Sequence, residues 1–297
     1  MRQVEKQKSW GWPIILYIFL AGLGGGTFLF SFILLFMEKY ERIARIGALV
    51  GPLVVAFASV LLIFDLGSPT RAYRLFTTPK TLMSSWMTRG AWILTAFIIL
   101  GLAYALPAFS LFNWLPWHQS SGLGQVIGFA AAVLSVIVPI YPGLLLGVIK
   151  SIPLWNTSAL PPIFFLSGLD TGIALLVMVS VFLPSAIDVA GFHLLGTIDI
   201  VLIILLLVAL FAYIEVVRQS GITAAASIHL LKTPLFIGGV VIGGMILPLI
   251  LLIISVSIPD ILSIRILDGI TGVLILSGAL LLRFSVVTSG LHRAVEL

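Results

Sequence analysis

The chain has 297 residues, of which 60% are hydrophobic and only 9% charged, with a formal net charge of +5. Soluble domains carry about 25% charged residues, so this composition and the mean hydropathy of +1.23 indicate a polytopic membrane protein. The absence of cysteine excludes disulfides, and it excludes iron–sulfur clusters or thiolate metal sites held by this chain. Nucleic-acid binding is not indicated, because the basic residues lie between apolar segments, where they orient a membrane protein.

Eight apolar segments are long enough to cross about 30 Å of hydrocarbon and are predicted as transmembrane helices. The first follows a basic N-terminus and is too long for the core of a signal peptide. Glycine, proline and charged residues mark the breaks between segments. The predicted spans are 13–37, 46–66, 88–109, 123–149, 162–184, 194–217, 234–257 and 265–289.

The first and fifth segments resemble each other. FLAGLGGGTF begins at Phe19 and FLSGLDTGIA at Phe165, an offset of four helices (165 − 19 = 146 residues). We therefore predict an all-α membrane protein of eight transmembrane helices, arranged as two four-helix bundles related by duplication. The bundles are residues 1–150 and 151–297. Because each half has an even number of spans, the internal repeat is parallel.

The run GLGGG at Gly22–Gly26 has two interpretations. Small residues let helix backbones approach closely in lipid, and missing side chains also leave room for a flat ligand beside the first helix. A phosphate-binding loop is excluded, since the run lies inside a span and no strand precedes it.

The lysines and arginines are distributed unequally between the two sides of the membrane. Eleven lie on the side of the N-terminus and four on the opposite side. The positive-inside tendency therefore predicts that both termini are cytoplasmic. A partner subunit docked on the basic face is the alternative explanation of this excess.

Ionisable residues inside apolar segments are costly in lipid and are functional candidates. Asp170, Asp199, Glu215 and Arg283 are such residues, and Asp268 opens the last segment. One interpretation is a structural clamp in which Arg283 pairs with Asp170 or Glu215. The other is a path that carries protons partway across the bilayer through Asp170, Asp199, Glu215 and Arg283.

Histidine placement argues against a transmembrane cytochrome b, whose haem needs axial ligands deep in its helices. All four histidines lie in predicted loops or at helix ends, and no cluster has metal-ligand spacing. These residues are His118, His193, His229 and His292.

The strongest local signal is the connection between the second and third segments, with DLGSPTR and SSWMTRGAW. Together with YIFLAGLGGG, YPGLLLGVIKSIPLWNTSALPPIFFLSGL and LLLRFSVVTSG, these motifs resemble the NrfD/PsrC family, the membrane subunits of polysulfide reductase and related complexes. The motifs occur in family order and cover nearly the whole chain. The resemblance implies eight helices in two bundles, as the repeat predicts independently.

The resemblance also implies a cofactor and partners. The cofactor is a quinone, menaquinone or ubiquinone, with no haem and no metal in this chain. The partners are a four-cluster ferredoxin-like iron–sulfur subunit and, through it, a molybdopterin-type or other redox catalytic subunit. Many members place the quinone beside a periplasmic partner, whereas the basic residues of this chain predict a cytoplasmic one.

Family positions imply a quinone pocket in the first bundle, near the connection that carries DLG. Tyr17 and Tyr141 match aromatic positions, Asp65 the acid of DLG, Arg71 the following basic residue, and Arg283 the arginine of the last helix. A tyrosine hydroxyl both donates to and accepts from a quinone oxygen or hydroxyl. The alternatives are an interfacial aromatic belt for the tyrosines and a loop-ordering ion pair for Asp65 with Arg71.

The sequence thus predicts a quinone-binding, multi-pass subunit of a respiratory oxidoreductase in the cytoplasmic membrane, without activity of its own. Two other classes stay open. A secondary transporter or proton-conducting protein also combines repeats with buried charges, and a plain membrane anchor needs no quinone. The terminal substrate belongs to another subunit.

Overall fold

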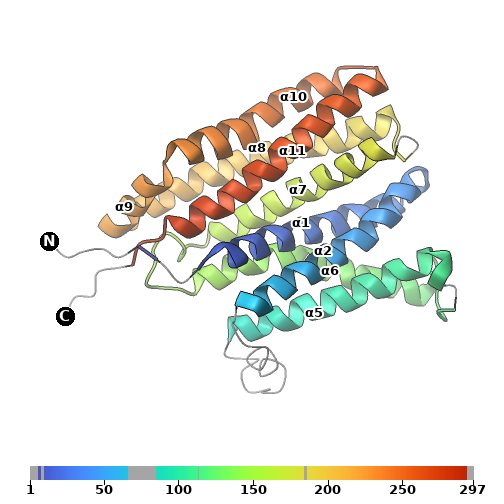
Figure 1. Cartoon of the computed structure of the whole chain (residues 1–297), viewed down its shortest axis with the longest axis horizontal. Coiled ribbons are helices and arrows are strands. Elements are labelled where there is room, and N and C mark those ends of the chain that lie inside the picture. Colours follow the sequence, from blue (N-terminus) through green and yellow to red (C-terminus); the bar gives the residue numbers. More distant parts are fainter. Residues whose placement is uncertain (1–5, 8–9, 66–84, 113, 184–185, 293–297) are drawn as a thin grey trace.

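The computed structural model describes residues 6–7, 10–65, 85–112, 114–183 and 186–292, with the backbone alone for the last two residues of the helix that ends at Asp65. Long helices run along one axis of an elongated molecule, and the first and last described segments, which meet at Lys6 and Leu291, lie at the same end of it (Figure 1). Among the described residues, eight helices are long and apolar enough to cross a membrane. The predicted all-α membrane fold with eight spans is therefore confirmed.

The first group of helices consists of α1 (Trp12–Leu35), α2 (Glu41–Asp65), α5 (Trp86–Ala105) and α6 (Gly122–Gly147). Helix α1 packs on α2 and α6, and α5 packs on the same two helices. These contacts close a four-helix bundle, which is called bundle one below.

The second group consists of α7 (Leu160–Phe182), α8 (Val189–Gln219), the π-helix η4 (Leu235–Ile246) continued by α10 (Leu247–Val256), and α11 (Ile261–Thr288). Helix α7 packs on α8 and α11, while α10 packs on α8 and α11. This four-helix group is called bundle two.

Helix boundaries differ from the prediction where polar residues start a helix. Helix α8 begins at Val189, before the predicted span, because Asp188 caps it: the Gly191 N–H donates to the Asp188 carboxylate at 3.0 Å. Helix α2 likewise begins at Glu41, inside a predicted break. A short helix, α9 (Ile222–Leu231), lies in a segment predicted as loop, since its sequence is apolar and free of breakers.

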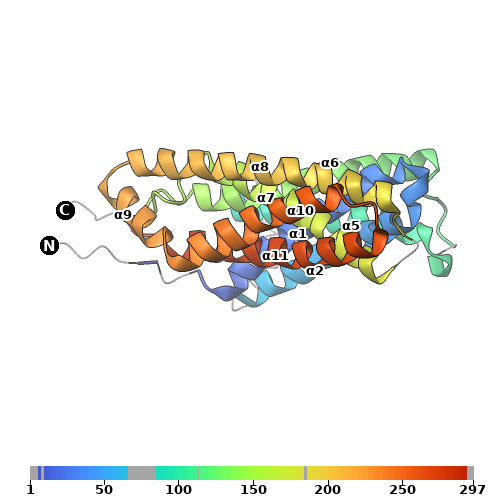
Figure 2. The same cartoon turned by 90° about the horizontal axis from the view of Figure 1, so that it is seen from above.

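The two faces of the molecule are named here by the helix ends they contain. The termini face holds the start of α1, the end of α2 and the start of α5. The far face holds the end of α1 and the starts of α2 and α8. The view from above shows the same lengthwise run of helices between these faces (Figure 2).

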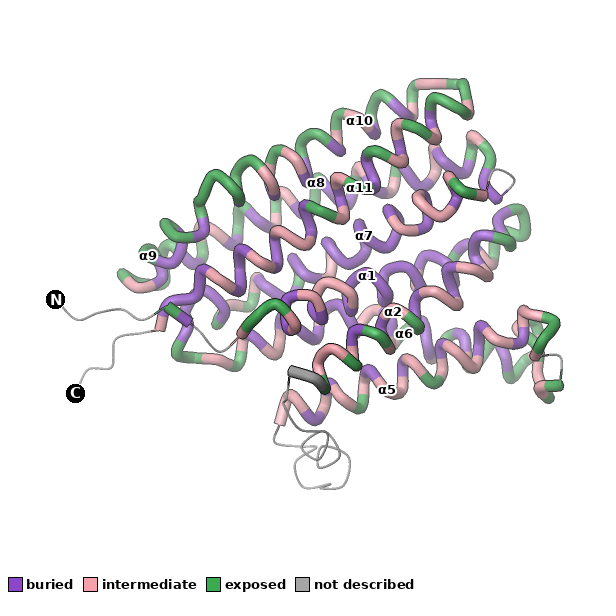
Figure 3. Tube along the Cα trace, in the orientation of Figure 1, coloured by how far each residue is buried: buried purple, intermediate pink, exposed green. Residues whose placement is uncertain are grey.

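Helices α1 and α7 form the centre of the molecule. They are buried along most of their length, whereas α8 and α10 keep exposed outer surfaces (Figure 3). Exposed side chains such as Phe57 and Phe211 are apolar, which suits a surface in contact with lipid.

Glycines set the distance between α1 and α7. A Cβ atom added at Gly168 would lie 3.2 Å from the Cα of Gly22, and one added at Gly172 would lie 2.5 Å from the backbone nitrogen of Thr27. Backbones this close admit no side chain, so α1 and α7 pack through small residues, as helices in lipid commonly do.

The remaining glycines of the run face other helices. A Cβ at Gly24 would lie 2.5 Å from the Gly51 carbonyl of α2, and one at Gly25 would lie 2.8 Å from the Ser135 carbonyl of α6. Close packing is therefore confirmed for GLGGG, because neighbouring helices occupy the space that a flat ligand would need.

The glycine contacts also bear on the predicted duplication. Gly22 meets Gly168 and Gly26 meets Gly172, and both pairs have the offset of the sequence echo. When two halves of a protein are related by a two-fold axis, equivalent residues that lie close to this axis contact each other. The contacts support the duplication, which stays a prediction.

Candidate functional site

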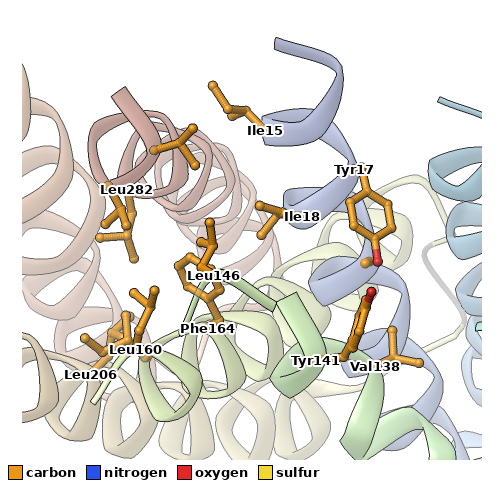
Figure 4. Close-up of a cluster of buried hydrophobic side chains, with 14 of the residues drawn as sticks. Ile15, Tyr17, Ile18, Val138, Tyr141, Leu146, Leu160, Phe164, Leu206 and Leu282 are labelled. Carbon is orange, nitrogen blue, oxygen red and sulfur yellow. The ribbon is translucent and has the colours of Figure 1, made fainter. Parts of the chain in front are cut away.

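Two tyrosines from different helices of bundle one meet near the termini face. Tyr17 lies in the second turn of α1 and Tyr141 lies near the end of α6, and both are buried. Their hydroxyl groups point toward one another (Figure 4). The structure thus brings together the two aromatic residues that the sequence singled out, and it buries them more deeply than an interfacial aromatic belt requires.

Helix α5 supplies the third wall of this site. The Tyr141 ring lies directly against Gly90, where an added Cβ would overlap the ring and its hydroxyl. Thr88, two residues before Gly90, is buried and its hydroxyl has no hydrogen-bond partner. Gly90 is accordingly a positioning residue for Tyr141, a role that sequence reasoning did not assign.

The Tyr17 hydroxyl is also buried without a hydrogen-bond partner. Buried hydroxyls are rarely left unpaired, since the loss of water contacts is then uncompensated. An orphaned hydroxyl that faces a second tyrosine hydroxyl suits a ligand with an acceptor oxygen, so the Tyr17–Tyr141 site fits a quinone carbonyl.

Asp65 ends α2 on the termini face, on the same side as Tyr17. Its side chain, and the whole of Arg71, lie outside the described residues. Their predicted part in the site stays a prediction.

The connection between the bundles closes the termini face. Trp155 is buried, its indole N–H donates to the Val286 carbonyl at 2.9 Å, and its ring packs on Trp10 with centroids 5.4 Å apart. The Tyr213 hydroxyl donates to the Leu154 carbonyl at 2.8 Å. The segment IPLWN is therefore a structural plug that seals bundle two from this face.

Arg283 forms a second polar centre, between the bundles. It is fully buried, donates to the Ser167 hydroxyl at 2.7 Å, and lies over the rings of Phe19 and Phe164. Two of its guanidinium nitrogens have no partner. No ion pair within 4 Å joins it to Asp170 among the described residues, so the predicted clamp is at most a longer-range attraction.

Buried carboxyl groups continue from this centre toward the far face. Asp170 of α7 lies one turn beyond Ser167, and its side chain is within hydrogen-bonding reach of Asp199 of α8. Since carboxylates have no donor, such a contact needs a proton on one of the two groups. Each keeps one oxygen without a partner.

Asp268 of α11 extends the row. It lies close to Asp199 of α8 and to Ser255 near the end of α10. A cavity of about 10 Å³ lies between Asp199 and Asp268, which is about the space of one water molecule.

Glu215 lies apart from this row. It is partly exposed near the end of α8 and pairs with Arg218 one turn away, at 3.4 Å. The structure therefore groups Asp170, Asp199 and Arg283 from the predicted set and adds Asp268. The signal for Asp268 was present in the sequence as an acid early in an apolar segment, but only the fold places it next to Asp199.

A surface ion pair joins the bundles on the far face. Lys39 lies 2.6 Å from the Asp188 carboxylate, and the Tyr40 hydroxyl donates to the same carboxylate at 3.3 Å. The hydrogen bond from Lys39, aided by the Gly191 N–H, lowers the pKa of Asp188 below its usual value.

Comparison with known proteins gives a family match over nearly the whole chain. The family model "Polysulphide reductase, NrfD" matches residues 2–295. A polysulfide reductase chain of Wolinella succinogenes is 29% identical, over 95% of this chain and 94% of its own length. Protein NrfD of Escherichia coli is 25% identical over 56% and 57% of the two chains. A selenate reductase subunit of Mesobacillus selenatarsenatis is 25% identical over 63% and 51%.

Proposed function

The chain belongs to the NrfD family, and from that premise we propose that it is the quinone-binding membrane subunit of a multi-subunit respiratory oxidoreductase. The resemblance inferred from the five motifs is confirmed, and the chain is a multi-pass membrane protein. Relatives named as parts of polysulfide and selenate reductases support a membrane subunit of a respiratory oxidoreductase. Quinone binding and the exchange of electrons with an iron–sulfur subunit are the further steps of the proposal.

The observation that carries the proposal is the buried meeting of Tyr17 and Tyr141 beside Gly90. A bound quinone supplies two-electron chemistry coupled to two protons. The tyrosine hydroxyls hold its carbonyl oxygen by donating hydrogen bonds, and the Tyr17 hydroxyl has no competing partner.

Proton exchange at this site needs a titratable group with access to water. Asp65 ends α2 at the termini face, and we assign it, with Arg71, to the exchange of protons with the quinone oxygens. Electrons require a partner, because this chain has no redox centre of its own. We place an iron–sulfur subunit of the four-cluster ferredoxin type on the termini face, and a molybdopterin-type catalytic subunit beyond it.

The test is Tyr141→Phe in the assembled complex. The ring and its packing against Gly90 remain, but one hydrogen bond to the quinone is lost, so quinol-linked turnover should fall about tenfold. Tyr40→Phe is the matched control, since its hydroxyl bonds Asp188 on the far face. Unchanged turnover in an intact Tyr141→Phe complex would remove the quinone from this site and leave a plain membrane anchor.

A second function is favoured by the row of polar groups in bundle two. Arg283, Asp170, Asp199 and Asp268 connect the neighbourhood of the termini face to that of the far face. We propose that this row moves protons across part of bundle two during turnover. Intramembrane carboxyl groups in contact are a common arrangement for proton relays.

Two conservative substitutions test whether protons move through the row of Asp170, Asp199 and Asp268 and not through Glu215. In proteoliposomes containing the complex, Asp199→Asn should reduce the protons released per quinol, whereas Glu215→Gln should not. Equal proton release in Asp199→Asn and the wild type would refute the path. Uptake of a solute by the chain alone, without partner subunits, would instead support the secondary transporter.

A further inference from the structure

A cavity on the far face of bundle one plays no part in the proposals above. It measures about 850 Å³. Tyr17 and Phe32 are fifteen residues apart on α1, so this cavity lies about 22 Å along the helix from the tyrosine site. Its lining residues include Phe32, Phe36, Glu38, Glu41, Arg45, Tyr104, Ala108, His118, Gln119 and Phe129.

The inner wall of the cavity is aromatic. The rings of Phe32 and Tyr104 pack edge to face, with centroids 5.6 Å apart. Gly128 lets both approach α6, because a Cβ there would lie 2.5 Å from the Tyr104 ring and 2.9 Å from the Phe32 ring. Two further rings at the mouth, Phe36 and Phe129, are largely exposed on the outer surface. The cavity thus opens toward the position of the membrane lipids.

Two hydrogen-bond donors in the lining are buried and unpartnered. They are the side-chain nitrogen Nε2 of Gln119 and the guanidinium Nε of Arg45. Another nitrogen of Arg45 pairs with Glu41, one turn earlier on α2, and this pair restrains the side chain that carries the orphaned Nε. Donors fixed in this way call for a ligand that brings acceptor oxygens.

The charged residues that line the cavity indicate which kind of acceptor group a ligand would bring. Glu38 and Glu41 outnumber Arg45, so an anionic phosphate gains no excess of positive charge here, whereas an uncharged carbonyl meets no repulsion. We propose that this cavity binds the polar end of a membrane lipid through neutral carbonyl oxygens, with the tail lying along Phe36 and Phe129. Two lipids carry such oxygens: a quinone on its ring and a glycerolipid in its esters.

The test uses the purified complex in lipid nanodiscs with a photoreactive azido-quinone, and native mass spectrometry of retained lipids. Ala108→Trp fills the cavity, and Val126→Trp is the matched control, because Val126 is exposed near the start of α6 and lies outside the lining. Gln119→Leu removes one donor and should weaken binding about threefold to tenfold.

A quinone is identified if the azido-quinone labels residues 104–129 and unlabelled quinone competes with this labelling. Ala108→Trp should then abolish the labelling, and Val126→Trp should not. A glycerolipid is identified if one co-purifies with the wild type and with Val126→Trp but not with Ala108→Trp, and if the azido-quinone does not label residues 104–129. Equal labelling and equal lipid retention in both tryptophan variants would overturn the proposal. Labelling around Tyr17 and Tyr141 appears on other peptides. A failure of the proposed quinone site at the termini face can therefore be distinguished from a failure of the far-face cavity.

Discussion

Single residues decide whether the tyrosine site is preformed. Tyr17 and Tyr141 come from helices whose meeting depends on Gly25 and Gly90, because α1 touches α6 at the first and α5 touches the Tyr141 ring at the second. The glycines act on the site without offering it any polar atom. Their substitution therefore separates the placement of the tyrosine ring from its chemistry.

We predict that Gly90→Ala impairs the site through packing alone. The added methyl overlaps the Tyr141 ring, which must move, so the apparent affinity of the complex for quinol should fall while its assembly is retained. Quinol titration of turnover measures this effect. Gly269→Ala is the control, because its Cβ would make an ordinary contact of 3.6 Å with Val181. An unchanged quinol titration in Gly90→Ala would contradict the assigned role of Gly90.

For single residues, the sequence shows which polar side chains lie in the spans, but it does not show which side chains they contact. Tyr17 and Tyr141 stood out only through the resemblance to the family, whereas Asp170 and Arg283 stood out because ionisable groups are rare in apolar segments. Glu215 stood out for the same reason, but the turn of α8 directs it to Arg218. Which helix faces lie opposite each other depends on rotations about helix axes, and a single sequence contains no measure of these rotations.

At the scale of helices, the α1–α7 contact joins the bundles through backbone approach. We predict that Gly172→Ala destabilises the protein by about 1–3 kcal/mol, as overpacking of a close interface does. Thermal inactivation in mild detergent measures the change. Gly238→Ala is the comparison, since a Cβ there meets nothing within 4 Å. Equal stability of the two variants would mean that α1 and α7 can separate without cost.

The far-face ion pair predicts a pH dependence of stability. The pKa of Asp188 is lowered in the folded protein, so its contribution is present above the unfolded value of about 3.9 and is lost as pH falls through the lower folded value. Asp188→Asn keeps a good helix cap but loses the pair with Lys39.

The melting temperatures of the wild type and Asp188→Asn should therefore differ by a constant amount above about pH 4 and converge below it. Asp260→Asn controls for capping, because Asp260 caps α11 through Ser263 and, within the described part of the chain, makes no ion pair across the bundles. A difference that persists unchanged at about pH 2, below the usual pKa of a carboxyl group, would contradict the role given to Lys39.

Helix positions were largely predictable because a membrane span needs about 20 apolar residues. The failures are polar starts and short helices: the start of α2 at Glu41 and the whole of α9 (Ile222–Leu231). Capping and local packing set these boundaries, and hydropathy does not register them. The π-helical geometry of η4 likewise has no hydropathy signal.

For the whole molecule, the eight candidate spans among the described residues predict that both termini lie on one side of the membrane. We predict from the basic residues that this side is the cytoplasm. Reporter enzymes that work only in the cytoplasm or only in the periplasm, fused after the last residue, measure this orientation. Activity of the periplasmic reporter would show that the basic residues serve docking of a partner on the opposite side of the membrane.

The most direct measurement for the central claim is gentle purification from native membranes in which all partners are expressed. Mass spectrometry identifies co-purifying proteins, and iron and quinone are quantified in the same sample. The account predicts a cysteine-rich iron–sulfur partner and stoichiometric quinone, with less bound quinone in Tyr141→Phe. A chain that purifies alone, free of iron and quinone, would contradict it and favour a transporter.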